Sequence, residues 1–463
     1  MAENSNRKQE KDFTAEVDQL IGTLDSSEKG VTIQEKLDRL LVLEKQTRNA
    51  SDLSSTTRLL VKIVTIVFES NNIDGLCQNV QQLSRKHGQL RQATTTMVEK
   101  VMTFLELVSQ EDNLKLINSL REVTEGKIYL EVQRARLTKK LAIIKESAGK
   151  TAEANDLMQE LQVETFGSMD RREKMDFILE QMRLLLTQRD WEKMAIVSKK
   201  INNKWLAEAE NEDLKLRFYA LMITYAAKSS RYLDLCKYYR SIYESESIKS
   251  DPVKSLAALR NAVYFVILAP HDNEQSDLLH RIATQEEELK NIEAVHDLVK
   301  CFTTSELMRW PGIQELYGPA LRKSKVFGPR GSIGLEGDIE EYVDPEVDSG
   351  EQRWQELHKR VVEHNIRAVS KYYTRLTMQR LSELLDLSPQ ESESTLAKLV
   401  SSKTVYAKID RPSGIVQFKP KDQQSNQGEN VLNTWNSEVG KLLGLVEKTV
   451  HLIHKEFALQ GIK

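Results

Sequence analysis

The feature that most constrains this 463-residue chain is the absence of proline from its first 251 residues. The same stretch holds only seven glycines, and these two residue types normally mark the turns between strands and loops. Three of the glycines, Gly88, Gly126 and Gly167, are 38 and 41 residues apart, which is about one helix pair each. We therefore predict a right-handed helical-repeat solenoid over residues 31–250, preceded by a tail and first helix over residues 1–30.

The character of the chain changes after residue 250. The first proline is Pro252, and the continuous apolar run at residues 262–269 predicts a buried helix. Further on, residues 331–352 contain eight acidic residues and no lysine or arginine, and glycine recurs from Gly328 onward. We predict a second domain over residues 251–420, with a helical part at 251–327 and an acidic, glycine-rich loop at 328–352.

Residues 353–420 have the pattern of a winged helix. Two helices are predicted at Arg353–Tyr373 and Thr377–Asp386, and a third begins at Ser388-Pro389-Gln390-Glu391, which is a strong helix-start signal. Alternation at Val405–Ile409 and a return at Ile415–Phe418 predict a small β-hairpin. Because a strand at the edge of a sheet can accept a strand from a partner, we predict Ile415, Val416, Gln417 and Phe418 as an inter-subunit edge.

The last segment, residues 427–463, is predicted as one long C-terminal helix. Its apolar residues recur every three or four positions, close to a heptad seam. The seam without an obvious partner in the chain predicts a helix that joins a multi-helix bundle. Its residues are Trp435, Val439, Leu442, Val446, Val450, Ile453 and Phe457.

Charge and composition exclude several classes of protein. The 66 basic and 69 acidic residues give a net charge of −3, which argues against a polybasic nucleic-acid clamp and against attraction to anionic membranes. The start of the sequence has no apolar leader, and the longest apolar run is too short to span a bilayer. Three widely spaced cysteines are not a disulfide framework, so we expect a cytoplasmic and nuclear protein.

No motif predicts catalysis, a cofactor or a metal. Gly149-Lys150-Thr151 resembles the end of a phosphate loop but lacks the upstream glycine, because Ile144 stands at that position. The glycines of residues 328–337 lack the flanking strand and helix of a dinucleotide site. His451 and His454 are three residues apart without a third ligand. We therefore expect a protein that is not an enzyme.

Two further patterns could indicate nucleic-acid binding, but each is better explained in another way. Lys237–Arg240 and Lys371–Tyr373 interleave tyrosine with basic residues, which suits base stacking, but at helical spacing core packing is favoured. The third winged-helix helix, residues 389–403, carries no arginine and no net charge, so it lacks the phosphate contacts of a groove reader. We expect the domain to bind proteins.

The order of solenoid, winged helix and terminal helix resembles the PCI-domain subunits of the lid of the 26S proteasome regulatory particle, from about residue 12 onward. The stretches that carry the resemblance are Leu43–Arg48, Val123–Tyr129, Glu160–Thr165, Val266–Pro270, Asp272–Leu278 and Val361–Arg367. The paralogous signalosome subunit shares Glu363-His364-Asn365 in kind, whereas Asp272–Leu278 separates the two families better.

The resemblance implies a non-catalytic scaffold that supports ATP-dependent degradation of ubiquitinated proteins. It implies that winged helices of several subunits pair edge to edge and that their terminal helices form one bundle. It also implies that the solenoid, residues 31–250, forms an arm that reaches toward the ATPase ring, the core-particle subunits and the lid metallo-deubiquitinase. Two alternatives stay open, which are a signalosome scaffold subunit and an RNA-associated winged-helix PCI protein.

Overall fold

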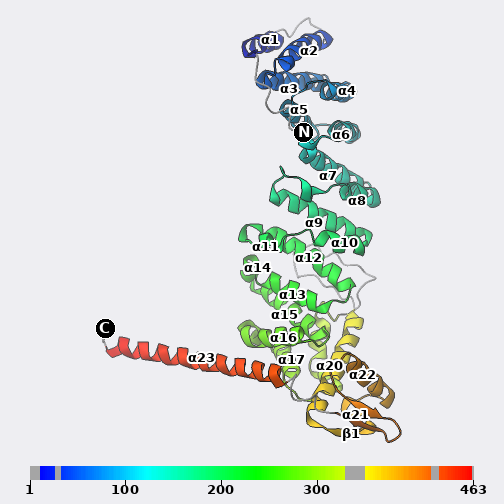
Figure 1. The fold of residues 1–463 in the computed structure, drawn as a ribbon, viewed down its shortest axis with the longest axis vertical. Helices are drawn as coiled ribbons and strands as arrows, with labels where there is room; N and C mark the ends of the chain where they lie inside the picture. Colours follow the sequence, from blue (N-terminus) through cyan, green and yellow to red (C-terminus); the bar gives the residue numbers. More distant parts are fainter. Residues whose placement is uncertain (1–10, 27–32, 329–349, 419–426, 461–463) are drawn as a thin grey trace. The chain divides into compact units, whose positions relative to one another are not determined.

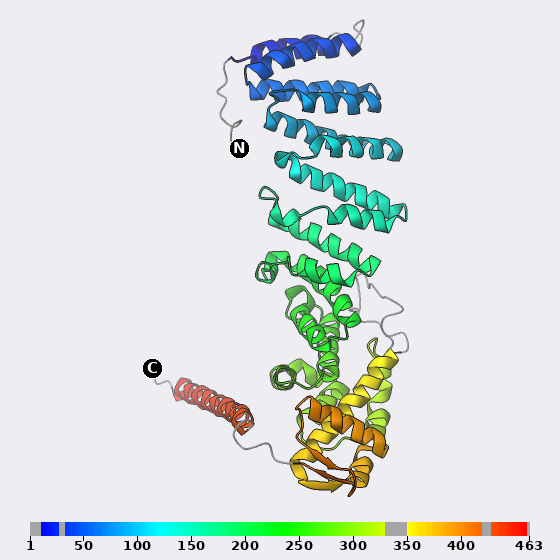
Figure 2. The same ribbon diagram turned by 45° about the vertical axis from the view of Figure 1, so that its right-hand side comes forward.

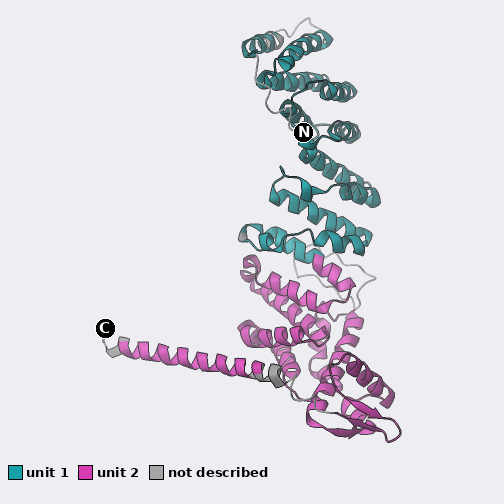
Figure 3. Cartoon of the chain, in the orientation of Figure 1, with its two compact units in different colours: residues 1–221 teal, residues 222–463 magenta. Residues whose placement is uncertain are grey.

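A computed structural model describes residues 11–26, 33–328, 350–418 and 427–460. The described residues form 23 α-helices, a few short 3-10 turns and one three-stranded sheet. The chain divides into two compact units, residues 1–221 and 222–463, with the division inside helix α12 (Figures 1 and 3). The predicted class, mainly helical with a helical array and a winged helix, is confirmed. The boundary predicted at residue 250 falls between α14 and α15 of the second unit.

The first unit is a succession of antiparallel helices stacked one on the next (Figure 2). Its elements are α1 (Thr14–Ser26), α2 (Ile33–Asn49), α3 (Leu53–Glu69), α4 (Ile73–Arg85), α5 (Arg91–Phe104), α6 (Gln110–Thr124), η1 (Ile128–Leu130), α7 (Glu131–Ser147), α8 (Thr151–Gln159), η2 (Val163–Thr165), α9 (Arg171–Gln188), α10 (Trp191–Ser198), α11 (Asn203–Leu206), η3 (Ala209–Asn211) and the first part of α12 (Glu212–Lys228).

Local sequence explains where these helices begin and end. Asp52, Asp170 and Asp190 cap α3, α9 and α10 by accepting hydrogen bonds from main-chain N–H groups of the first turn. Gly126 and Gly149 follow α6 and α7 with φ values of 69° and 78°, a left-handed conformation that glycine adopts without strain. The interpretation of Gly126 as a residue between two helices is confirmed, and Gly149 has the same role.

Ion pairs at the repeat distance join helices of neighbouring repeats in the first unit. Arg136 on α7 contacts Glu173 on α9 at 2.6 Å, and the two residues are 37 positions apart. Arg183 of α9 reaches back to Glu146 of α7 at 2.6 Å, while Arg217 of α12 contacts Asp176 of α9 at 2.8 Å. A spacing of 37–41 residues between partners is the repeat length that the glycine spacing predicts.

The second unit contains a helical part and the winged helix. Its elements are the rest of α12, α13 (Tyr232–Tyr243), α14 (Glu246–Lys249), α15 (Pro252–Leu268), α16 (Asn273–Gln285), η4 (Glu287–Asn291), α17 (Glu293–Thr303), α18 (Trp310–Leu316), α19 (Gly318–Lys323), α20 (Gly350–Tyr372), β1 (Arg375–Thr377), α21 (Met378–Leu385), α22 (Pro389–Ser401), β2 (Lys408–Asp410), β3 (Ile415–Gln417) and α23 (Gln427–Gln460).

The apolar run at residues 262–269 forms the last part of α15 and its C-cap residue Ala269, and it is buried along its whole length, as predicted. Most of the predicted acidic loop, residues 329–349, lies outside the described residues. The winged-helix core forms where α20, α21 and α22 pack against the sheet, and it includes Ile366, Leu381, Leu396 and Val416. Ser388 and Glu391 form the predicted capping box of α22, because each side chain is bonded to the other residue's main-chain N–H.

Candidate protein-interaction surfaces

The sheet of the winged helix has the strand order β1-β3-β2, with both pairs antiparallel. Leu376 lies opposite Val416, which lies opposite Ile409, so these three side chains form one row on the core side. The neighbouring row is exposed and crosses the sheet from Arg375 through Gln417 to Lys408.

The predicted edge strand is wrong. Residues Ile415, Val416 and Gln417 form the central strand β3, paired on both sides, and the Phe418 N–H donates to Thr374 O at 2.9 Å. The error arises because β1, only three residues long, was not predicted. The signal in the sequence was one apolar residue, Leu376, between the polar residues Arg375 and Thr377. An alternation of three residues is too short to distinguish a strand from a loop.

The ladder shows which main-chain groups point outward at the true edges. Phe418 N donates to Thr374 O, and Met378 N donates to Gly414 O at 2.8 Å. Bonded positions alternate along an antiparallel pair, so β1 points the N–H and C=O of Arg375 and Thr377 away from β3. On the opposite edge, the same alternation turns the main-chain groups of Ile409 outward. Within the described residues no further strand covers either edge.

An ion pair joins the wing, which is the β2–β3 hairpin, to the third helix of the domain, α22. Arg411, in the turn between β2 and β3, contacts Glu393 of α22 at 2.7 Å. The exposed positions of α22 include Gln390, Glu391, Ser394 and Lys398, which give a polar surface with balanced charge. An arginine of the wing is therefore engaged with the helix that would read a DNA groove, which disfavours base readout.

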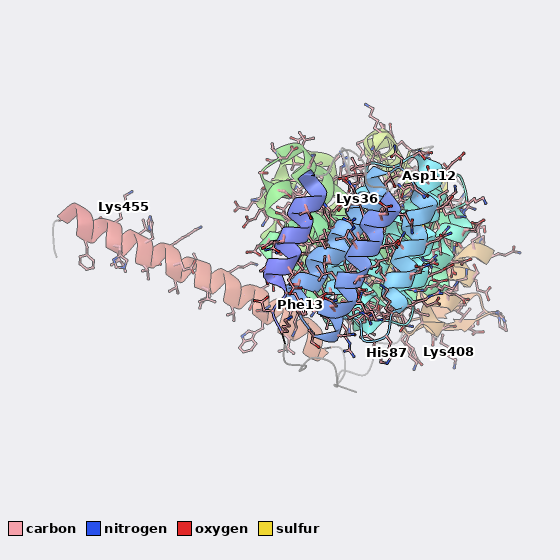
Figure 4. All side chains as sticks on the ribbon, turned by 90° about the horizontal axis from the view of Figure 1, so that it is seen from above. Phe13, Lys36, His87, Asp112, Lys408 and Lys455 are labelled. Atoms are coloured by element: carbon pink, nitrogen blue, oxygen red, sulfur yellow. The ribbon has the colours of Figure 1, made fainter. Side chains whose placement is uncertain are left out.

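Helix α23 carries the largest group of exposed apolar side chains in the described residues. All seven predicted seam residues are helical and exposed. Four leucines that the seam prediction missed are exposed as well, and these are Leu432, Leu443, Leu445 and Leu452. Successive helix residues turn by about 100°, so the eleven side chains span a sector of roughly 180°. Figure 4 shows side chains projecting from α23, with Lys455 labelled.

The two aromatic and basic stretches have different surroundings. Tyr239 is fully buried and stacks on Phe265 with ring centroids 5.5 Å apart, as the core interpretation of Lys237–Arg240 requires. Tyr372 and Tyr373 are 70% and 39% exposed at the end of α20, so the same interpretation is wrong for Lys371–Tyr373. Helical spacing alone could not separate these cases, because α20 ends at Tyr372 and leaves both rings beyond the packed part of the helix.

The stretch Val361–Arg367 is a structural joint. Asn365 accepts a hydrogen bond from Met308 N at 2.8 Å and donates to Met308 O at 2.6 Å, while the His364 ring contacts Glu306 O at 3.1 Å. Burial, together with the nearby positive charge of Arg367, lowers the pKa of His364 to about 4. The His364-Asn365 pair therefore holds the segment before α18 against α20, and both side chains are used inside the fold.

The phosphate-loop and histidine motifs considered in the sequence lack the structural surroundings that their chemistry requires. Gly149 forms the turn between α7 and α8, and neither flank is a strand. His451 and His454 lie three residues apart on α23 and are exposed. In the described parts of the chain, no three His, Cys, Asp or Glu side chains are grouped as metal ligands. None of the described helices has both the length and the apolar content to cross a membrane.

Three family models match successive parts of this chain. The model described as PSMD12/CSN4, N-terminal, matches residues 35–251, and the PCI domain model matches residues 305–420. The model of the 26S proteasome regulatory subunit RPN5 C-terminal domain matches residues 429–461, which is most of α23. The long terminal helix is thus a domain with a family model of its own.

Known proteins match over nearly the whole length. The 26S proteasome regulatory subunit rpn501 of Schizosaccharomyces pombe is 42% identical over 434 residues, or 94% of this chain and 93% of that protein. RPN5 of Saccharomyces cerevisiae is 41% identical over 92% of both chains. The 26S proteasome non-ATPase regulatory subunit 12 of Dictyostelium discoideum is 39% identical, over 92% of this chain and 90% of that protein.

The signalosome alternative has a weaker match. COP9 signalosome complex subunit 4 of Caenorhabditis elegans is 23% identical over 251 residues, covering 54% of this chain and 52% of that protein. The proteasome relatives are more similar and extend through the winged helix and α23. The chain belongs to the PCI-domain family of 26S proteasome regulatory subunits that includes Rpn5 and non-ATPase regulatory subunit 12.

Proposed function

We propose that this chain is a non-catalytic scaffold subunit of the lid of the proteasome regulatory particle. The observation that carries the proposal is the match, over more than nine-tenths of the chain, to proteins named as 26S proteasome regulatory subunits. The scaffold supports assembly and the ATP-dependent degradation of ubiquitinated proteins through contacts between proteins. With three free cysteines and balanced charge, it works in the cytoplasm and nucleus.

The two sheet edges are proposed as the contacts with other PCI-domain subunits. The β1 edge presents Arg375 and Thr377, whereas the β2 edge presents Lys408 and Asp410 around Ile409. Because the two edges differ, pairing of one edge with the other edge of a neighbour is heterologous and builds a row of subunits. Main-chain hydrogen bonds would supply the pairing, and the flanking charges would select the neighbour.

Helix α23 is proposed to join the terminal helices of those subunits in one bundle. Its apolar sector is wider than the seam of a two-stranded coiled coil, which favours contact with more than one helix. The arm, residues 31–250, is proposed to contact the ATPase ring, core-particle subunits and the metallo-deubiquitinase. That last assignment rests on the family resemblance. Ion pairs between neighbouring repeats of the first unit help to hold that part of the arm together.

The first experiment is purification of the tagged full chain from its native cells, with native sizing and mass spectrometry of the eluate. Co-elution with proteasomal ATPases and core subunits at megadalton size supports the lid assignment. Signalosome subunits in place of proteasomal ones would overturn it. A bare monomer with bound RNA would favour the RNA-associated alternative, which the neutral α22 disfavours.

Proline variants test the edges without disturbing the inner ladder. In Arg375→Pro the lost N–H points outward from β1, and an edge strand tolerates proline there. Ala407→Pro likewise removes an outward-pointing N–H next to β2, because the main-chain groups of residues 407 and 409 both point away from β3. Arg375→Ala and Ala407→Ser are the matched controls that keep the N–H. We expect each proline variant to lose its crosslinks to neighbouring PCI-domain subunits while its control keeps them. Equal crosslinking by variant and control would remove the edge assignment.

The bundle assignment has a separate test. Leu442→Glu, Val446→Glu and Ile453→Glu together place three charges in the centre of the apolar sector and leave the rest of the chain unchanged. The matched control is Ser437→Glu, Gly444→Glu and His451→Glu, spaced seven residues apart on the opposite side of α23. A Cβ at Gly444 would meet no atom within 4 Å. Normal incorporation of the apolar-face variant would refute the bundle role.

A further inference from the structure

The apolar sector of α23 needs a cover even before the chain meets other subunits. Eleven side chains between 38% and 63% exposed lie on this one helix, from Leu432 to Phe457. Together they expose on the order of 1,000 Å² of apolar surface, whereas the largest patch on an ordinary monomer is about 300–600 Å². The area also exceeds the roughly 800 Å² that each partner buries in a stable interface.

The rest of the described chain offers no matching surface. The thirteen other large apolar side chains that are exposed lie on many different elements, for example Val42 on α2, Ile143 on α7 and Leu316 on α18. None of these elements presents a continuous stripe of comparable length. Among the residues that the structure describes, α23 is the one element with an apolar face of this length, so a matching face is offered by the same helix of a second copy.

The pattern of α23 suits association with itself. Leu432 and Phe457 are 25 residues and seven steps apart along the stripe, so the mean spacing is about 3.6 residues and the stripe follows a straight helix. Between these residues the helix carries three lysines and three glutamates, which gives no net charge and no overall repulsion between copies. Lys441, Lys448 and Lys455 repeat every seven residues outside the apolar sector, where a bundle leaves them in water.

We propose that the free subunit self-associates through α23, so that a bundle of identical helices covers the apolar sector until partner subunits replace it. The inference deepens the proposed bundle role and rests on it for the exchange step. Because apolar side chains occupy both flanks of the stripe, a pair of helices would leave one flank exposed, and more than two copies complete the cover. Lid assembly through this helix is then an exchange between a homomeric and a heteromeric bundle.

The test measures the mass of the purified full chain by light scattering over a dilution series, with circular dichroism to confirm folding. We expect multiples of 53.1 kDa that fall toward the monomer mass on dilution. The glutamate variant at Leu442, Val446 and Ile453 should be monomeric throughout, while the control at Ser437, Gly444 and His451 should associate like the unchanged chain. A milder variant, with alanine at residues 442, 446 and 453, keeps the helix propensity of α23. It should shift the midpoint of association to a higher protein concentration.

Two outcomes would overturn the proposal. One is a monomer at every concentration, and the other is association that the apolar-face glutamates leave unchanged, because another surface would then be responsible. Neither outcome decides the proposed function, since the lid incorporation of the same variants is measured separately. A monomeric wild-type chain whose apolar-face variant still fails to incorporate would refute self-association and leave the scaffold assignment standing.

Discussion

Asn365 is predicted to be the residue on which the joint between the helical part and the winged helix depends most. Its side chain is 2% exposed and makes two hydrogen bonds with the main chain of Met308, at 2.8 Å and 2.6 Å. Met308 in turn packs with Ile313 and Val361 in a small apolar cluster. In Asn365→Ala, both bonds are lost and the N–H and C=O of Met308 stay buried without them.

The expected cost follows from those two groups. A buried polar group left without its partner costs about 1–3 kcal/mol, so two such groups, with some relief by water, give about 2–4 kcal/mol. Each 1.4 kcal/mol is a tenfold change, so exchange of the Met308 amide with solvent should become roughly 30-fold to 700-fold faster. Hydrogen exchange is the suitable assay, because a chain with two compact units need not unfold in one step.

Lys371→Ala is the matched control for this prediction. Lys371 holds the same segment by donating to Ser305 Oγ at 2.8 Å, but the pair is exposed, so its loss should cost about 0–1 kcal/mol. Exchange is followed in the full-length protein on the peptide that contains residues 305–312. If Asn365→Ala accelerates exchange no more than Lys371→Ala does, the assignment of Asn365 as a structural clamp is refuted.

Three further predictions concern single sites. Burial lowers the pKa values of His271 and His364 to about 4, against about 6.5 in the unfolded chain, so protons bind the unfolded state first. The free energy of unfolding should therefore fall as pH drops from 6.5 to 4, by up to about 3 kcal/mol per histidine. In His364→Gln the pH dependence of the free energy of urea unfolding should become flatter, and an unchanged slope would contradict the prediction. Asp52→Ala removes the cap of α3 and the acceptor of the Phe13 N–H, so α1 should lose about 1–3 kcal/mol of protection, which limited proteolysis of residues 11–26 measures against Asp52→Asn. Ser388→Ala should lower the stability of α22 by about 1 kcal/mol in hydrogen exchange, whereas Ser388→Asp keeps an acceptor and should be nearly neutral.

The helices were predictable because their signals are local. Apolar spacing located α15 and α23, and Ser388-Pro389 marked the start of α22 within one residue. These features depend on the 3.6-residue period and on side chains that bond the nearest main-chain groups. They need no knowledge of what lies across the fold.

The sheet edges were not predictable in the same way. Strand β1 spans only Arg375–Thr377, and what makes it a strand is its pairing with β3, which lies about 40 residues later. The position of the true edges follows from that pairing, so one missed strand moved the predicted edge to the centre of the sheet. The exposure of Tyr372 and the clamp made by Asn365 likewise depend on distant partners, and no spacing rule contains them.

The two proposed surfaces should have different roles in assembly because they differ in physical kind. A three-residue edge offers about three main-chain hydrogen bonds, each worth roughly 0.5–1.5 kcal/mol net, with little apolar burial. Complete cover of the eleven half-exposed side chains of α23 contributes about 1 kcal/mol each, or on the order of 10 kcal/mol before the cost of association. Hydrogen bonds and flanking charges at an edge require a defined register, whereas an apolar stripe accepts several helices. The edges should therefore decide which subunits are neighbours, and α23 should supply most of the affinity. On this argument Arg375→Pro would change which neighbours are crosslinked to the chain more than it changes yield, and the apolar-face variant of α23 would do the reverse.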